Sequence, residues 1–257
     1  MALRDRHAYR ACVEVAREGL GAFPTDGSEA ERAAAASVWL IVHDGLEPLG
    51  VVGEARQAIE RALALTSGGT GPEALFAAAG AQLLMGRALM QGGDHDEARS
   101  RFEEAAAAFG KAGHTRERAV AMGEIADILQ ARGQLDEALR IRREEELPVH
   151  EALGDVRERA VTLGRIADVL AARGQLDEAL RIHREEELPV YEALGDVRSL
   201  LVARTKLALN LQSRSRPGDL EEAHSLLTLA LEAAERLRIP EAQTIRQILA
   251  RAMPGSP

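Results

Sequence analysis

The chain has 257 residues, of which 46% are hydrophobic and 28% are charged, as expected of a packed protein in water. Aromatic residues make up only 3%, so alanine and leucine contacts must carry the packing, and both residues favour helices. The net charge of -9 argues against a nucleic-acid-binding surface, and the single cysteine, Cys12, excludes an intrachain disulfide and a multi-cysteine zinc site. We therefore expect an all-α protein.

The amino-terminal segment shows no apolar targeting sequence. The longest apolar stretch, Val38 to Val42, is too short to span a bilayer. These features predict a cytoplasmic protein that contacts no membrane. In such a reducing compartment, we expect Cys12 to be a small, buried side chain.

Three helices are predicted in the first third of the chain, over residues 3–20, 28–43 and 50–65. Gly45, Pro48 and Gly50 should break the chain after the second helix, and residues 67–71 should form a linker. This glycine-rich linker lacks the Gly-Lys-Ser/Thr ending of a phosphate-binding loop and follows no strand. We expect residues 1–71 to contain capping helices and one degenerate repeat.

An internal repeat dominates the centre of the chain. Residues 114–154 and 155–195 align without gaps and are identical at 32 of 41 positions. A diverged copy follows residue 195, and another precedes residue 114. Repeats of this length predict stacked helix pairs, which we place at about 72–113, 114–154, 155–195 and 196–236. Together they form a repeat region over residues 72–236, and residues 237–257 are expected to form a capping helix and a frayed tail.

Each copy predicts two antiparallel helices joined by a turn. Apolar residues recur at helical spacing over residues 120–129, Gly133 ends the first helix, and Asp136 begins the second. Pro148 and Pro189 occupy the same late position in the second helix of two copies. Because proline lacks an N–H and its ring clashes with the preceding turn, we expect the helix to bend or end there.

These helix pairs resemble the tetratricopeptide repeat family. Its consensus has a small residue in the first helix and then alanine, an aromatic residue and alanine in the second, and Gly86, Ala98, Phe102 and Ala105 occupy these positions. In the two near-identical copies, polar residues replace the later aromatic residue and alanine, namely Arg142, Glu145, His183 and Glu186. Those copies are similar to the longer repeat variant, of about 41 to 42 residues, found in kinesin light chain and bacterial scaffold proteins. The resemblance implies a right-handed superhelical array of antiparallel helix pairs, an α-solenoid.

The resemblance also implies a binding site, because in this family the first helix of each pair lines a concave groove that binds a protein or peptide segment. The positions that would line it are Glu124, Asp127, Gln130, Arg165, Asp168, Lys206 and Asn210. Their charge changes from acidic through mixed to basic along the array, so an extended peptide of complementary charge could be held in one direction. Solvated helix faces explain the same residues equally well.

The expected function is a non-catalytic scaffold or adaptor for protein–protein interaction in a bacterial cytoplasm. One alternative is a regulatory subunit or arm of a separately encoded effector enzyme, such as a caspase-like protease. Another is a self-assembling structural protein, since near-identical repeats with exposed end faces can stack into a homo-oligomer. Partners would then be another protein, a peptide segment or a second copy, with no nucleic acid and no membrane.

No catalytic, metal or cofactor site is expected. No motif brings a nucleophile together with a base, and His95 has no second histidine at the spacing that a helical metal site needs. His150 and His183 exchange with Tyr191 and Arg142 between copies. We therefore expect these two histidines at the surface or at an interface.

Overall fold

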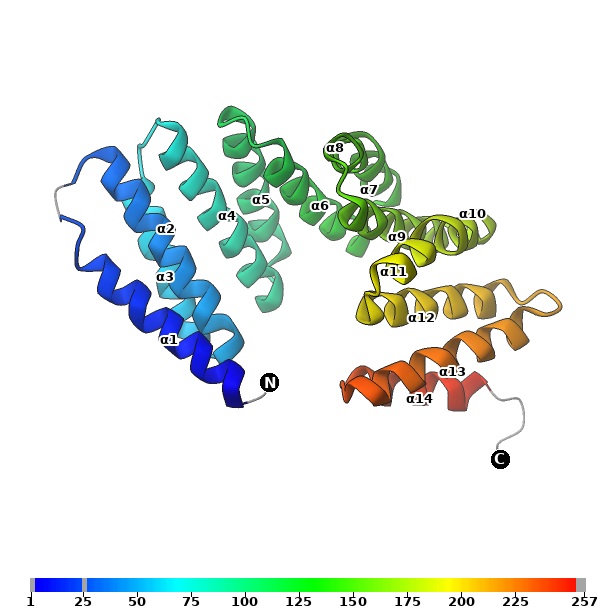
Figure 1. Ribbon diagram of the computed structural model, residues 1–257. Helices are drawn as coiled ribbons and strands as arrows, with labels where there is room; N and C mark the ends of the chain where they lie inside the picture. The colour runs from blue at the N-terminus through cyan, green and yellow to red at the C-terminus, as the bar shows by residue number, and fades with distance from the viewer. Residues whose placement is uncertain (1–2, 25–26, 253–257) are drawn as a thin grey trace. The chain divides into compact units, whose positions relative to one another are not determined.

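The computed structural model describes residues 3–24 and 27–252, and all regular secondary structure in these ranges is helical (Figure 1). The all-α prediction is confirmed. The α-helices are α1 (Leu3–Leu20), α2 (Glu29–Leu46), α3 (Val52–Thr66), α4 (Pro72–Gly92), α5 (His95–Lys111), α6 (Thr115–Ala131), α7 (Leu135–Ile141), α8 (Leu147–Leu153), α9 (Val156–Ala172), α10 (Leu176–Ile182), α11 (Leu188–Leu194), α12 (Val197–Arg214), α13 (Asp219–Leu237) and α14 (Glu241–Ala252).

Three short segments have other helical geometries. They are the 3₁₀-helix η1 (Glu47–Leu49) and the π-helices η2 (Arg142–Glu146) and η3 (His183–Glu187). The chain forms two compact units, residues 1–128 and 129–257, and the division falls within α6. The predicted division of the chain at residues 71 and 236 stays a prediction.

In the first unit, α2 packs against α3, α4 packs against α5, and α1 lies along α2. Ser28 begins α2 with a capping box, in which its hydroxyl accepts a hydrogen bond from the Glu31 N–H and the Glu31 carboxylate accepts one from the Ser28 N–H. Val13 of α1 and Val42 of α2 are buried together. The three helices predicted for this part of the chain are all present.

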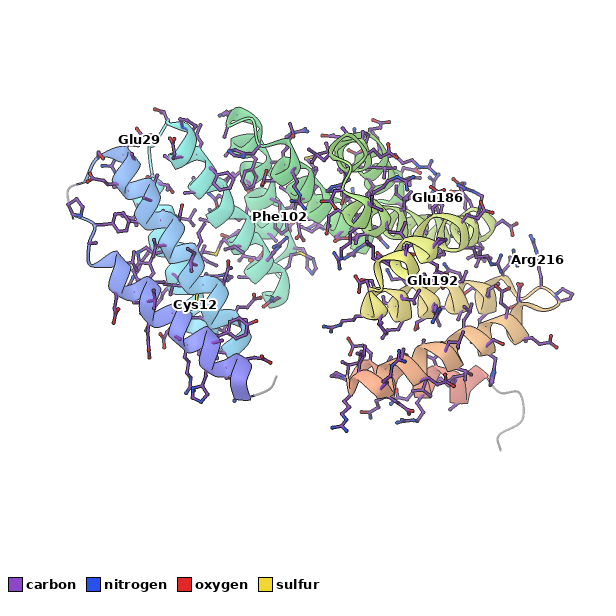
Figure 2. The ribbon with its side chains drawn as sticks, in the orientation of Figure 1. Cys12, Glu29, Phe102, Glu186, Glu192 and Arg216 are labelled. Atoms are coloured by element: carbon purple, nitrogen blue, oxygen red, sulfur yellow. The ribbon has the colours of Figure 1, made fainter. Side chains whose placement is uncertain are left out.

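Two expectations for the first unit are wrong. Gly45 lies inside α2 and not at a break. A Cβ at this position would come within 2.6 Å of Val13 Cγ2, so glycine here lets α1 pack closely against α2. Cys12 is exposed on α1 (Figure 2), because Val13 and Ala16 form the buried face of this helix.

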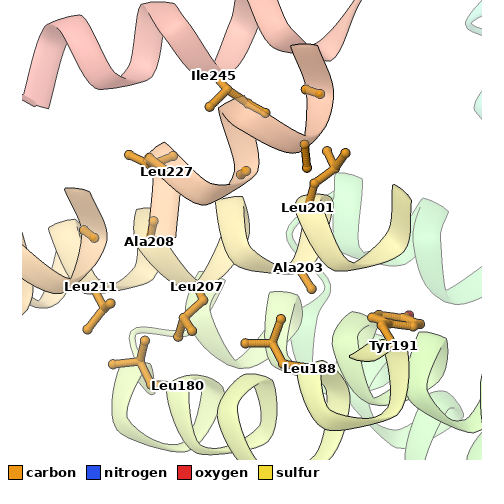
Figure 3. Packing of buried hydrophobic residues seen from close by; sticks show 14 of the residues in the cluster. Leu180, Leu188, Tyr191, Leu201, Ala203, Leu207, Ala208, Leu211, Leu227 and Ile245 are labelled. Atoms are coloured by element: carbon orange, nitrogen blue, oxygen red, sulfur yellow. The ribbon is translucent and has the colours of Figure 1, made fainter. Parts of the chain in front are cut away.

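In the second unit, α9 packs against α10 and α11, and α12 packs against α13. Figure 3 shows the apolar core between these layers, in which Leu188, Leu207 and Leu227 are buried. Helix α14 covers α13 and buries Ile245. The frayed tail expected at the end of the chain lies outside the described residues.

Pro148 and Pro189 interrupt the regular α-helix, as predicted. Before Pro148 the Leu147 N–H donates to the Arg142 carbonyl, five residues back, and the next copy repeats this bond. In a regular α-helix the proline ring would clash with the carbonyl four residues before it. A single wider turn of π-helix at this point is a recognised way to insert a residue into an α-helix. The two prolines therefore explain why each second helix is divided into two α-helical parts.

The turns between paired helices use the left-handed conformation at matching positions. Gly133 has a φ angle of 75° and Gly174 one of 78°. The third copy has no glycine at the corresponding position, but Ser215 adopts a φ angle of 52° there. The inserted residues therefore lengthen the turn after this position, and the first helix of this copy, α12, runs one residue further than α9 does.

Candidate functional site

The seven residues of the predicted groove lie on the first helices of three successive pairs. Helix α6 carries Glu124, Asp127 and Gln130, helix α9 carries Arg165 and Asp168, and helix α12 carries Lys206 and Asn210. Arg165 is exposed and the other six are partly exposed. We call these seven residues the predicted face.

Ion pairs connect the predicted face to neighbouring first helices. The Glu124 carboxylate lies 2.7 Å from Arg87 Nε in α4, and the Asp168 carboxylate lies 2.6 Å from Lys206 Nζ. The paired side chains are all partly exposed to solvent, so each pair contributes little to stability. Much of the charge gradient predicted from the sequence is therefore neutralised between adjacent helices. A bound segment would use the side chains around these pairs or compete with them.

A surface hollow of about 350 Å³ lies beside the predicted face in the second unit. It brings together Arg165 of α9 and Lys206 of α12, which the sequence analysis had selected. Val161, Tyr191 and Val202 add apolar surface to the same hollow. This mixture of apolar surface and cationic side chains suits the binding of a polypeptide better than the binding of a small apolar molecule.

Tyr191 is the residue of this hollow that sequence reasoning missed most clearly. Its burial, together with the nearby Glu187 carboxylate, raises the pKa of Tyr191. The phenol therefore keeps its proton, and with it a hydrogen-bond donor, to a more alkaline pH than an ordinary tyrosine does. The exchange of His150 for Tyr191 between two otherwise similar copies was the available signal, because it marks a place where the repeats differ.

Buried polar pairs occupy the π-helical segments. In η2, Arg142 Nη1 donates to Glu146 Oε2 at 2.6 Å, and the Thr162 hydroxyl of α9 donates to the other Glu146 oxygen at 3.1 Å. In η3, His183 Nδ1 lies 2.5 Å from Glu187 Oε2. Each pair sits at i and i+4 and satisfies a charge that the core would otherwise leave without a partner.

His150 and His183 are both buried, so of the two placements expected for them the surface one is wrong and the interface one stays a prediction. Phe102, the aromatic residue at the position of His183 in the first copy, is also fully buried. Of the polar residues that replace the consensus aromatic residue and alanine, Arg142 and His183 are therefore buried, whereas Glu145 and Glu186 are partly exposed. Gly164 leaves space for the Glu187 side chain, because any residue with a Cβ at position 164 would place that atom within 2.2 Å of a Glu187 carboxylate oxygen.

A second hollow, of about 370 Å³, lies in the first unit and contains none of the predicted residues. Phe76 of α4 forms one wall, and Ala30 and Ala34 of α2 lie on another. Helices α2 and α4 fall in regions predicted to be a cap and an early repeat, and the predicted binding residues all lie on α6, α9 and α12. The one available signal was an aromatic residue on the exposed side of a first helix.

The segments considered for other chemistry have structural roles. The Glu29 carboxylate accepts hydrogen bonds of 2.6 Å from both the Thr70 and Gly71 N–H groups, so the glycine-rich linker already has an anionic partner. These two bonds lower the pKa of Glu29. Asp94 caps the start of α5, next to His95.

Within residues 3–24 and 27–252, no group of three or more His, Cys, Asp or Glu side chains is placed to hold a metal ion. In the same residues, no helix is long and apolar enough to cross a membrane.

Comparison with known proteins identifies the class of protein. Residues 77–144 match the family model of the tetratricopeptide repeat. This match covers about a quarter of the chain, and together with the stacked helix pairs it supports a tetratricopeptide-type helical repeat protein. No curated protein matches the sequence significantly.

Solved structures similar to this chain include BtubC (BKLC) from P. vanneervenii, with a TM-score of 0.67 and 17% identity over 99% of this chain and 94% of that one. The nearly identical TPR-like repeats of a Podosopora anserina kinesin light chain match with a TM-score of 0.63 and 20% identity, over 80% of this chain and 97% of that one. A Rap protein complexed with competence and sporulation factor matches with a TM-score of 0.57 and 14% identity, over 96% of this chain and 70% of that one. At these identities the likeness concerns the fold.

Proposed function

We propose that this chain is a non-catalytic scaffold that binds a segment of another protein along the first helices of its pairs. The observation that carries the proposal is the hollow of the second unit, in which Arg165 and Lys206 border the apolar surface of Val161, Tyr191 and Val202. An extended segment can place apolar side chains against this surface and polar groups against the two cations.

The similarity to a Rap protein solved with competence and sporulation factor supports a protein or peptide ligand. Repeat scaffolds carry unrelated partners on one architecture, so the fold supports the class of ligand and the local side chains must select its members. We also propose that the protein acts in the cytoplasm and without nucleic acid, on the basis of its net charge of -9 and its single cysteine.

Affinity capture of the tagged protein from its own cells, followed by mass spectrometry and light scattering, tests the proposal. A stoichiometric protein partner that elutes with a single copy of the chain is the expected result. A co-purifying effector enzyme would favour the regulatory-subunit alternative. Elution as a homo-oligomer without any other protein would contradict the proposal and favour self-assembly.

A further inference from the structure

The hollow of the first unit has an apolar lining and one exposed aromatic wall. Ala30 and Ala34 of α2 are exposed, and their methyl groups leave the space that larger side chains would fill. Across this space, 39% of the Phe76 surface is exposed. The volume of about 370 Å³ is large enough to admit a leucine or an aromatic side chain from a partner.

The walls of this hollow are fixed before anything binds. The Phe76 ring packs edge-on against the buried Phe109 ring, with 5.7 Å between centroids, and lies 4.4 Å from the His114 ring. On the opposite side, Glu29 ties the start of α4 to α2 through the Thr70 and Gly71 N–H groups. A pre-formed pocket binds with less loss of conformational entropy.

The charge around the hollow distinguishes it from the hollow of the second unit. Among the described residues, Glu73 is the only aspartate, glutamate, lysine or arginine that lines it, and its side chain is exposed. The hollow of the second unit is instead lined by three cationic side chains, Arg165, Arg198 and Lys206, and by one carboxylate, Glu187. The single carboxylate of the first hollow, Glu73, and the net charge of -9 favour a ligand that carries positive charge.

We propose that the hollow formed by Ala30, Ala34, Glu73 and Phe76 binds a large apolar side chain of a basic segment in the partner protein. The apolar side chain packs against Phe76 and the two alanines, and a neighbouring arginine or lysine lies beside Glu73. This inference rests on the proposed function and names the kind of segment that the first unit selects.

Three labelled glycine-serine peptides test this selection by fluorescence anisotropy. The first carries one phenylalanine between two arginines, the second has alanine in place of phenylalanine, and the third has glutamates in place of the arginines. The first peptide should bind at least about tenfold more tightly than the second, because only phenylalanine fills the hollow. It should bind about threefold more tightly than the third, since the contact with Glu73 is exposed. Equal binding of all three peptides, or no binding of any, would overturn the proposal.

Variants with matched controls place the binding in this hollow. Ala34→Phe fills the hollow from the solvent side and should weaken the first peptide at least about tenfold, whereas Ala107→Phe, at an exposed alanine of α5, should leave it unchanged. Glu73→Lys should reverse the preference between the arginine and glutamate peptides, and Glu18→Lys, on the exposed side of α1, should not. Equal effects of a variant and its control would contradict the assignment.

The two proposals can fail separately. If Ala34→Phe leaves capture of the cellular partner unchanged but substitutions in the predicted face abolish it, the scaffold function stands and the apolar hollow is not the selecting site. If the protein captures no partner at all, the proposed function fails, whatever the peptides show.

Discussion

In the first three copies of the repeat, one position in the second helix carries three different side chains, and all of them are buried. Phe102 fills it in the first copy and packs so closely on α4 that a Cβ on Gly86 would come within 2.5 Å of the ring. Arg142 and His183 fill it in the next two copies, each paired with a glutamate one turn later. The repeat therefore keeps the volume of this position but exchanges an apolar ring for a buried ion pair or hydrogen bond.

Replacement of Arg142 should be costly because it leaves Glu146 buried without its cation. We expect Arg142→Met to reduce the free energy of unfolding by about 3 kcal/mol, as is typical when one partner of a buried pair is removed. Arg140→Met is the matched control, because Arg140 is on the exposed side of the same helix and should cost less than about 1 kcal/mol. Urea denaturation of both variants measures the difference, and similar losses would show that the buried pair has no special role.

Asp219 gives the protein a defined dependence on acid. The Arg214 guanidinium donates to both carboxylate oxygens and lowers the pKa of Asp219 from 3.8 to about 2. A lowered pKa in the folded state means that ionised Asp219 stabilises the fold above pH 3.8, and that this stabilisation is lost as the pH falls toward about 2. Asp219→Asn should therefore be less stable than the natural protein near neutral pH, and the difference should shrink over this range. A difference in urea midpoint that stays constant with pH would rule out this linkage.

At the scale of the helices, local signals predicted most of the structure. Residues 3–20 were predicted as a helix with the bounds that α1 has, because helix-forming residues end there at a glycine-rich turn. Gly45 misled the prediction, since its role in close packing depends on Val13, far away in the sequence. The prolines predicted an interruption, but the π-helical hydrogen bonds that produce it depend on the geometry of the whole second helix.

Ser215 is a local imperfection that a single substitution should correct. A non-glycine residue in the left-handed conformation is strained by about 1 kcal/mol, and glycine removes this strain at some cost in unfolded-chain entropy. We expect Ser215→Gly to raise the free energy of unfolding by about 0.5 kcal/mol. The reverse change at the matching turn, Gly174→Ser, should lower it by about 1 kcal/mol. Thermal unfolding followed by circular dichroism compares the two variants, and a loss of stability in both would contradict this account of the turn.

At the scale of the molecule, the sequence predicted the architecture but only part of the candidate site. The near identity of residues 114–154 and 155–195 was sufficient to predict stacked helix pairs. The predicted face followed from family resemblance, but the pairing of Glu124 with Arg87 joins residues in different repeats and has no local signal. The hollows could not be predicted either, because each depends on side chains from several helices and on the small size of residues such as Ala34.

Binding of a partner protein along the first helices can be tested by comparing two variants, each with four substitutions. A variant with Glu124→Gln, Asp127→Asn, Arg165→Gln and Lys206→Gln keeps the net charge and changes only the predicted face. The control variant carries Arg140→Gln, Glu144→Gln, Arg181→Gln and Glu185→Gln, which also keeps the net charge and alters exposed ion pairs on the second helices.

Both variants and the natural protein would be titrated with the captured partner by isothermal calorimetry. We expect the variant of the predicted face to bind at least about tenfold more weakly than the natural protein, and the control variant to bind within about twofold of it. Unchanged binding by the variant of the predicted face, or an equal loss in the control, would contradict this expectation.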